Sequence, residues 1–287
     1  MSLKYSVLRG IIKATGVKKM WDKPAEDLIR KRKKLNARMK IPKLRDKALD
    51  IDTVRIGGFP VMRMMQKSGS KRADLFIIGG GMIMPPSSGD LKKAVKIAKE
   101  TGLDLYVPFY PLCTDYPLSR AYMMIHAVYA SMLERYEPES ISVLGTSSGG
   151  NLALGLVAYI NANKLGTPMP GHIIAISPGT CVADEEEWRR MRELDRKDFL
   201  ISAQYMKTAE EIMRCGSDSV PDYMLFLQNG DFTNCPRVTF IYGSDEVLYA
   251  VAPSFEAAMN RYGVKYNMIV GQGMFHCYPF YPLVREA

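Results

Sequence analysis

The chain has 287 residues, of which 47% are hydrophobic and 24% are charged, values typical of a folded globular domain. No apolar run is long enough to cross a bilayer, and the first residues lack the small-residue cleavage site of a secretory signal. The five cysteines contain no CxxC pair, which excludes a disulfide framework and favours reduced thiols, so the sequence predicts a cytoplasmic protein.

The net charge of +9 is unevenly distributed. Residues 1–48 hold 16 Lys and Arg against 4 Asp and Glu, whereas the remainder holds 23 against 26. The run Arg30–Lys34 lacks the aromatic and polar side chains that accompany charge in nucleic-acid-binding proteins, so no nucleic-acid partner is predicted. Two interpretations stay open, a solvated helical face and a weak contact with an anionic surface.

The predicted elements alternate between strands and helices. Residues 1–48 form helices, and a hairpin across Gly57-Gly58 joins strands 51–56 and 59–66. Further strands are predicted at 74–78, 103–109, 141–144, 172–177, 237–242 and 265–270, with helices at 90–101, 118–136 and after Ser147. Residues 183–235 form an insertion with helices at 185–194 and 202–214 and no central strand. This order predicts one α/β domain with a mostly parallel, doubly wound sheet and an antiparallel hairpin at its edge.

A strand, a sharp turn and a helix follow each other at Ile141–Gly150, which reads ISVLGTSSGG. This context favours a nucleophile elbow with Ser147 on the turn, where Gly145 and Gly149 leave room for the backbone. The amino end of the helix at Ser148 would direct N–H groups toward a developing oxyanion. The alternative is an ordinary Gly-Ser turn.

A nucleophilic serine needs a base and a group that orients the base. Of the three histidines, His126 lies in a helical pattern and His172 opens a strand, whereas His276 follows the last strand, where catalytic groups gather in open α/β sheets. Asp245, directly after the strand at 237–242, is the predicted acid, and Glu246 is its competitor. The order Ser147, Asp245, His276 is the order that α/β-hydrolases use.

Bare backbone amides are needed to bind the oxyanion of an acyl-transfer reaction. Gly79-Gly80-Gly81 follows the strand at 74–78 and lies upstream of the elbow, which favours an oxyanion loop over an ordinary loop. Its amides would join that of Ser148.

Four motifs in this order, FIIGGG, GTSSGG, YGSDEVL and GMFHCY, resemble the hormone-sensitive-lipase-like, acetyl esterase branch of the α/β-hydrolases. The resemblance extends from about residue 50 to the end of the chain. It implies an α/β-hydrolase fold with a helical cap built from residues 1–48 and 183–235. It also implies Ser147 as nucleophile, Asp245 as acid and His276 as base, with Gly79, Gly80 and Ser148 as oxyanion donors supported by Gly81. Ile78 departs from the family, which has histidine there, and Thr146 stands where aspartate is commoner.

These observations predict a serine carboxylesterase that hydrolyses small short-acyl esters through an acyl-enzyme, with no cofactor and no metal. Methionines near the proposed loop and base are either an adaptable acyl wall or ordinary core residues. Two alternatives remain: an amide or peptide hydrolase with the same triad, and a ligand-binding homologue without catalysis. A small-molecule ester is the predicted partner, and a homodimer is a possible assembly.

Overall fold

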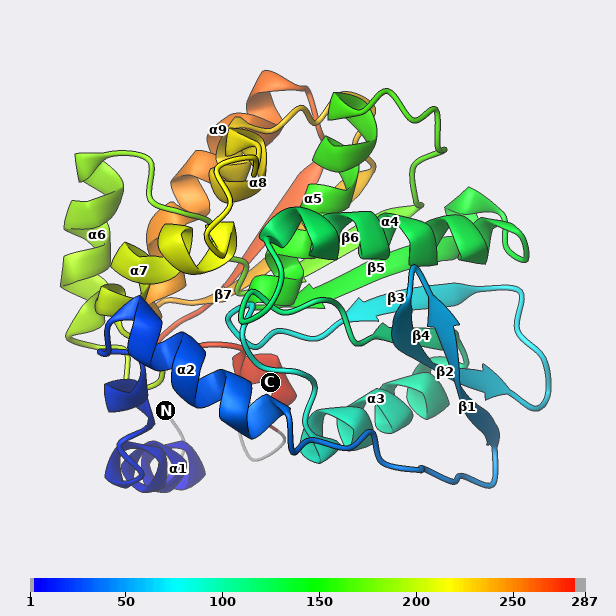
Figure 1. Cartoon of the computed structure of the whole chain (residues 1–287), viewed down its shortest axis with the longest axis horizontal. Coiled ribbons are helices and arrows are strands. Elements are labelled where there is room, and N and C mark those ends of the chain that lie inside the picture. Colours follow the sequence, from blue (N-terminus) through cyan, green and yellow to red (C-terminus); the bar gives the residue numbers. More distant parts are fainter. Residues whose placement is uncertain (1–2, 282–287) are drawn as a thin grey trace.

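An eight-stranded sheet forms the centre of the computed structural model, which describes residues 3–281 (Figure 1). Its strands are β1 (Leu49–Ile56), β2 (Phe59–Gln66), β3 (Ala73–Ile77), β4 (Asp104–Pro108), β5 (Ile141–Thr146), β6 (His172–Ile176), β7 (Arg237–Gly243) and β8 (Tyr266–Gly271). The spatial order is β1-β2-β4-β3-β5-β6-β7-β8. β2 pairs antiparallel with β1 and with β4, and all other neighbours are parallel. The predicted fold class is therefore confirmed.

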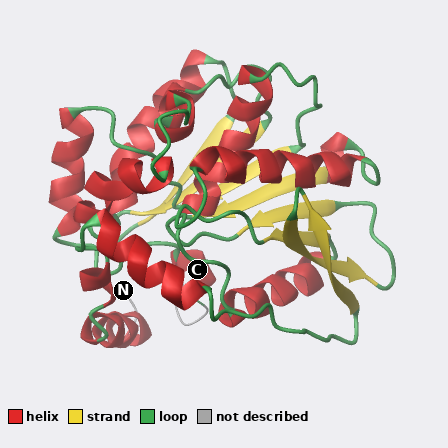
Figure 2. Cartoon of the chain, in the orientation of Figure 1, coloured by secondary structure: helices red, strands yellow, loops and turns green. Residues whose placement is uncertain are grey.

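Helices cover both faces of this sheet (Figure 2). They are α1 (Leu3–Ala14), α2 (Ala25–Asn36), α3 (Ser88–Thr101), α4 (Leu118–Leu133), α5 (Ser148–Ala162), α6 (Glu185–Asp195), α7 (Ala203–Arg214), α8 (Asp222–Leu225) and α9 (Ala252–Arg261). Short 3₁₀ turns lie at Val17–Met20, Pro138–Ser140, Leu227–Asn229, Val247–Val251 and Tyr278–Phe280.

The central strands are buried on both faces, as parallel strands between helical layers must be. In β6, Ile173 and Ala175 belong to the larger core, which includes residues of α4, α5 and α9. Ile174 and Ile176, one step along the strand, face the smaller core beneath α3. This alternation decides which core each side chain of the strand enters. The parallel pairing of β3, β5, β6, β7 and β8 places the loops at their carboxyl ends along one edge of the sheet.

Local sequence signals fix several element boundaries. Ser87 and Asp90 form a reciprocal capping box at the start of α3, and Gly102 ends that helix in a left-handed conformation. Helix α4 ends at Leu133, three residues before the predicted end. Tyr136 instead buries its ring and its hydroxyl bonds Asp104 Oδ2 at 2.5 Å, so a side-chain contact with the sheet replaces the last helical turn.

The N-terminal segment and the insertion at 183–235 contact each other. Trp21 packs edge-on against Tyr205 with ring centroids 4.6 Å apart, and Lys18 Nζ lies 3.0 Å from Asp195 Oδ1. Between β6 and β7 the described chain contains helices and loops but no strand. Among residues 3–281, no helix has the length and apolar character required to cross a membrane.

Candidate active site

Ser147 lies on a strained turn between β5 and α5. Its φ of 54° and ψ of −127° are unusual for a residue with a side chain, and its amide is held by the carbonyl of Ile176 at 2.8 Å. A Cβ at Gly149 would lie 2.0 Å from the carbonyl oxygen of Ile77, and one at Gly145 would lie 2.2 Å from that of Gly149. The elbow therefore requires both glycines, as the sequence predicts, and it presents Ser147 to a cavity.

The carboxylate that contacts His276 belongs to Glu246 and not to the predicted Asp245. Nδ1 of His276 lies 2.6 Å from Oε2 of Glu246. The predicted contact with Asp245 is wrong: Asp245 is partly exposed, and its Oδ1 accepts only a long bond of 3.4 Å from Ser244 Oγ in the described chain. The reason is the turn after β7, in which Ser244 and Asp245 form the outer corner and Glu246 points back into the interior.

Glu246 is fully buried and held by three donors. Its Oε1 accepts hydrogen bonds from the Ser177 hydroxyl and the Gly243 amide, each at 2.8 Å, while Oε2 faces the imidazole. Ser177 Oγ in turn accepts from the amide of Cys277 at 2.9 Å. The network fixes the carboxylate and the loop that carries His276 relative to each other.

Ser177 is a functional residue that no sequence motif marks. It lies at the carboxyl end of β6 with a φ of 49°, where an isolated hydroxyl before a proline carries only a weak signal. Its place in the Glu246 network becomes visible only once the strands are packed together.

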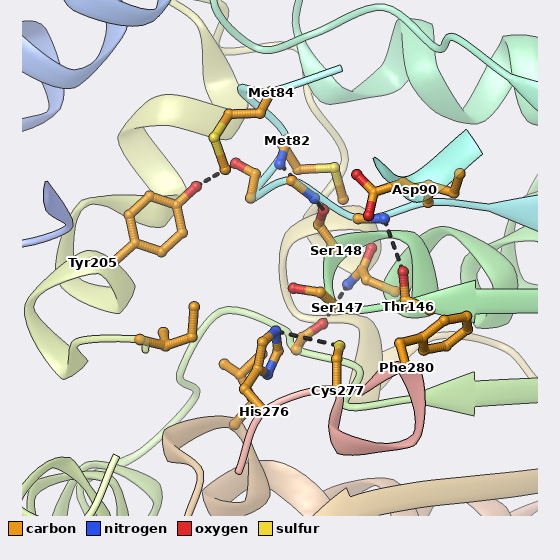
Figure 3. Close-up of a pocket in the computed structure, with 18 of the residues that line it drawn as sticks. Met82, Met84, Asp90, Thr146, Ser147, Ser148, Tyr205, His276, Cys277 and Phe280 are labelled. Carbon is orange, nitrogen blue, oxygen red and sulfur yellow. Dashed lines mark hydrogen bonds between the residues drawn. The ribbon is translucent and has the colours of Figure 1, made fainter. Parts of the chain in front are cut away.

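The other ring nitrogen of His276 faces the cavity that holds Ser147 (Figure 3). Nε2 lies 3.6 Å from Cys277 Sγ, and among the described residues it makes no hydrogen bond to the Ser147 hydroxyl. Catalytic hydrogen bonds are often loose before substrate binds. Burial disfavours the imidazolium, but the Cys277 thiol and the Glu246 carboxylate outweigh it and hold the pKa of His276 well above its ordinary value.

The hydroxyl groups on either side of Ser147 anchor the glycine loop. Thr146 Oγ1 accepts from the Gly79 amide at 3.0 Å, and Ser148 Oγ accepts from the amides of Gly80 at 3.0 Å and Met82 at 3.3 Å. Ile78 cannot anchor the loop through a polar side chain, so these elbow hydroxyls supply the anchoring.

This anchoring changes which amides are available to a substrate. Gly79, a predicted donor, is engaged by Thr146, and the Gly80 amide is engaged by Ser148. Within the described residues, the amides of Gly81 and Ser148 have no acceptor, and both residues line the cavity. The geometry thus favours Gly81 and Ser148 over Gly79 and Gly80 as the donors that are free in this structure.

Replacement of Thr146 by valine should loosen the glycine loop, because the side-chain shape is kept while the acceptor for Gly79 is lost. We expect the free energy of unfolding to fall by about 1–3 kcal/mol and kcat for an ester substrate to fall roughly tenfold. Thr146→Ser, which keeps the hydroxyl, is the matched control and should behave like the wild type. Thermal denaturation and steady-state kinetics measure both effects, and equal values for the two variants would contradict the anchoring role.

The cavity at Ser147 has a volume of about 270 Å³. In Figure 3, Tyr205 and Phe280 lie on opposite sides of Ser147. Large apolar side chains from the N-terminal segment, the glycine loop and α7 form much of the wall: Trp21, Met82, Met84, Tyr205, Met206 and Met213. Asp90 and Lys93 of α3 also line it, so the cavity has an apolar part and a charged edge.

The two remaining histidines lie outside this cavity. Nε2 of His126 pairs with Thr167 Oγ1 at 2.9 Å, and Nε2 of His172 pairs with Thr239 Oγ1 at 3.0 Å. Burial lowers the pKa of both side chains. Both histidines therefore pair with threonine hydroxyls away from Ser147.

Comparison with known proteins adds a family match and several relatives. A family model described as "alpha/beta hydrolase fold" matches residues 75–280. A triacylglycerol lipase of Mycobacterium tuberculosis is 31% identical over 103 residues, which is 36% of this chain and 23% of that protein. The chain therefore covers less than a quarter of that relative's length.

Two further similarities extend over most of the chain. An esterase of Acinetobacter venetianus is 21% identical over 229 residues, covering 79% of this chain and 74% of that protein. The crystal structure of an esterase from the bacterial hormone-sensitive lipase family superimposes with a TM-score of 0.79 at 19% identity, covering all of this chain and 94% of that one. At this level of identity the structural likeness shows a shared fold.

Proposed function

Because the chain belongs to the α/β-hydrolase fold family, we propose that it is a serine carboxylesterase that hydrolyses small esters through an acyl-enzyme. The observation that carries the proposal is the arrangement of Ser147 and His276. The strained Ser147 and the imidazole of His276 line one cavity. The buried Glu246 carboxylate pairs with Nδ1 of that imidazole. The similarity to a triacylglycerol lipase and to an esterase supports the same class of reaction.

In this mechanism Ser147 attacks the ester carbonyl while Nε2 of His276 takes the hydroxyl proton. Glu246 accepts the Nδ1–H bond, selects the tautomer with a free Nε2 and stabilises the imidazolium that forms. His276 then protonates the leaving alcohol, and afterwards it activates the water that hydrolyses the acyl-enzyme. Entry of the substrate must draw Nε2 from Cys277 toward Ser147.

The negative oxygen of the tetrahedral intermediate would lie between the amides of Gly81 and Ser148. Ser148 begins α5, so its amide belongs to the unpaired amino end of a 15-residue helix. Gly81 is held from the other side, because the Tyr205 hydroxyl donates to its carbonyl. Both donors are thus fixed before substrate arrives, which is what oxyanion stabilisation requires.

The cavity dimensions favour a short acyl chain. Trp21, Tyr205 and Met213 are among its lining residues, and its volume is near the lower end of the range for small-molecule sites. Methionine side chains can adapt to acyl groups of slightly different shape.

A panel of p-nitrophenyl esters tests this proposal. We expect the largest kcat/KM with acetate or butyrate and a decrease of about tenfold or more with octanoate, because the longer chain cannot be enclosed. Turnover of the matching anilides and no turnover of the esters would assign an amide hydrolase instead. Failure both to turn over any ester and to react with a fluorophosphonate would favour a binding protein and contradict the proposal.

A further inference from the structure

Exposed apolar side chains are concentrated in the N-terminal segment. Eight large hydrophobic residues are exposed in the described chain, and four of them lie within residues 1–48. These four are Val7, Ile11, Leu35 and Met39, with exposed fractions of 55%, 60%, 41% and 48%. Val7 and Ile11, four residues apart in α1, lie on one side of that helix, whereas Leu35 and Met39 lie at the end of α2 and just beyond it.

Helix α1 carries aliphatic residues on two adjacent sides, because Val7 and Ile11 each precede an inward-facing aliphatic residue by one position, about 100° around the helix. Leu8 and Ile12 pack inward against a small cluster that contains Phe199 and Phe275, next to the base His276. Val7 and Ile11 are left on the exposed side. The inner contacts hold the helix on the protein, and the outer pair has no role in packing the fold.

Leu35 lies in the last turn of α2 and Met39 lies three residues beyond the end of that helix, and lysines flank both in the sequence. Ala25 and Leu28 bury the inner side of that helix. Arg30 pairs with Asp27 and Lys33 with Asp115, but no ion pair in residues 3–281 engages Lys31, Lys34 or Lys40. Leu35 and Met39 therefore lie between cations that have no acidic partner within the described chain.

We propose that Val7, Ile11, Lys31, Lys34, Leu35 and Met39, here called the N-terminal basic face, dock on the surface of an anionic phospholipid bilayer. Figure 1 shows α1 at the lower left of the view and α2 running from there along the lower edge toward the middle, with residues 15–24 joining the two helices. The lysines complement the lipid headgroups, and the aliphatic residues enter the boundary between headgroups and acyl chains.

The charge distribution favours this orientation over any other. Residues 1–48 carry a net charge of +12, whereas the remaining chain carries −3, so an anionic surface attracts this segment and weakly repels the rest. Trp21, between α1 and α2, lines the catalytic cavity. Docking through the N-terminal basic face would thus place part of the cavity wall near the lipid.

A nucleic acid would explain the lysines but not the aliphatic residues. Phosphate backbones are recognised by charge and hydrogen bonding, to which exposed valine, isoleucine and leucine contribute nothing. A bilayer uses both kinds of side chain, and the two contributions can be separated by substitution.

Cosedimentation with lipid vesicles tests the proposal on the full chain, and it can use the Ser147→Ala variant so that no activity is needed. We expect binding to vesicles with about one part phosphatidylglycerol to three parts phosphatidylcholine, little binding to pure phosphatidylcholine, and release at about 0.5 M salt. The result is independent of the esterase proposal, because binding is read without turnover.

Matched substitutions identify the surface. Ile11→Glu and Met39→Glu together should weaken vesicle binding about tenfold or more, whereas Leu165→Glu and Met123→Glu, which alter exposed apolar residues elsewhere, should bind as the wild type does. Lys31→Gln with Lys34→Gln should weaken binding more than Lys71→Gln with Lys265→Gln. Circular dichroism and thermal denaturation check that each variant is folded.

Three outcomes would overturn the inference. The first is absence of binding to anionic vesicles at low salt. The second is an equal loss for the N-terminal variants and their matched controls. The third is binding of duplex DNA that depends on Lys31 and Lys34 but not on Ile11 and Met39, which would make the surface a general polyanion site.

Discussion

Replacement of Ser147 by alanine is expected to lower kcat/KM for p-nitrophenyl butyrate by roughly 10⁴-fold or more, with the protein still folded. The hydroxyl is the only group of the elbow that can form the acyl-enzyme, because Thr146 and Ser148 use their hydroxyls to hold the glycine loop. Alanine removes one oxygen from a residue whose backbone, not its side chain, makes the structural contacts. Ser147→Ala should therefore lower kcat/KM and leave the melting temperature nearly unchanged.

Two measurements distinguish loss of the catalytic hydroxyl from a defect in the folding of the variant. Ser131→Ala, which alters a hydroxyl on α4 that bonds the carbonyl of Val128, should keep wild-type activity. A fluorophosphonate should label the wild type at Ser147, located by peptide mass, and should not label Ser147→Ala. Equal ester turnover by Ser147→Ala and the wild type would remove Ser147 from the mechanism and leave the cavity as a binding site.

The elbow could be predicted from the sequence because its residues are contiguous, although the close approach that requires Gly149 is to Ile77 on β3. A β-branched strand, two glycines at the points of closest backbone approach and an immediate helix together specify the turn around Ser147. The hairpin at Gly57-Gly58 and the end of α3 at Gly102 are fixed by equally local conformational demands. These local signals identify single elements, whereas the order of the strands depends on pairings between segments distant in the sequence.

The partner of His276 depends on contacts that are distant in the sequence. Asp245 and Glu246 are adjacent carboxylates after one strand, and the turn after Gly243 decides which of them points inward. Glu246 is selected by the Ser177 hydroxyl, 69 residues away in the chain. The engagement of Gly79 and Gly80 by elbow hydroxyls is equally non-local, so the choice of oxyanion donors needed the structure.

Glu246→Gln should therefore be far more damaging than Asp245→Asn. An amide at position 246 keeps the size of the side chain but can turn an N–H toward Nδ1, which favours the imidazole tautomer whose Nε2 cannot accept the serine proton. We expect kcat to fall by about 10³- to 10⁴-fold in Glu246→Gln. Asp245→Asn should stay within about threefold of the wild type, because Asp245 contacts neither His276 nor the cavity.

The pH dependence of kcat/KM distinguishes removal of the Glu246 carboxylate from a disturbance of the local packing. Neutral imidazole is the base, so kcat/KM rises as the pH increases through the pKa of His276. The Glu246 carboxylate contributes to the raised pKa of His276, so removal of its charge lowers that pKa. The acidic limb of Glu246→Gln should accordingly lie at lower pH than that of the wild type, while Asp245→Asn leaves the limb in place. A large loss and a shifted limb in Asp245→Asn, with Glu246→Gln nearly normal, would restore Asp245 as the acid.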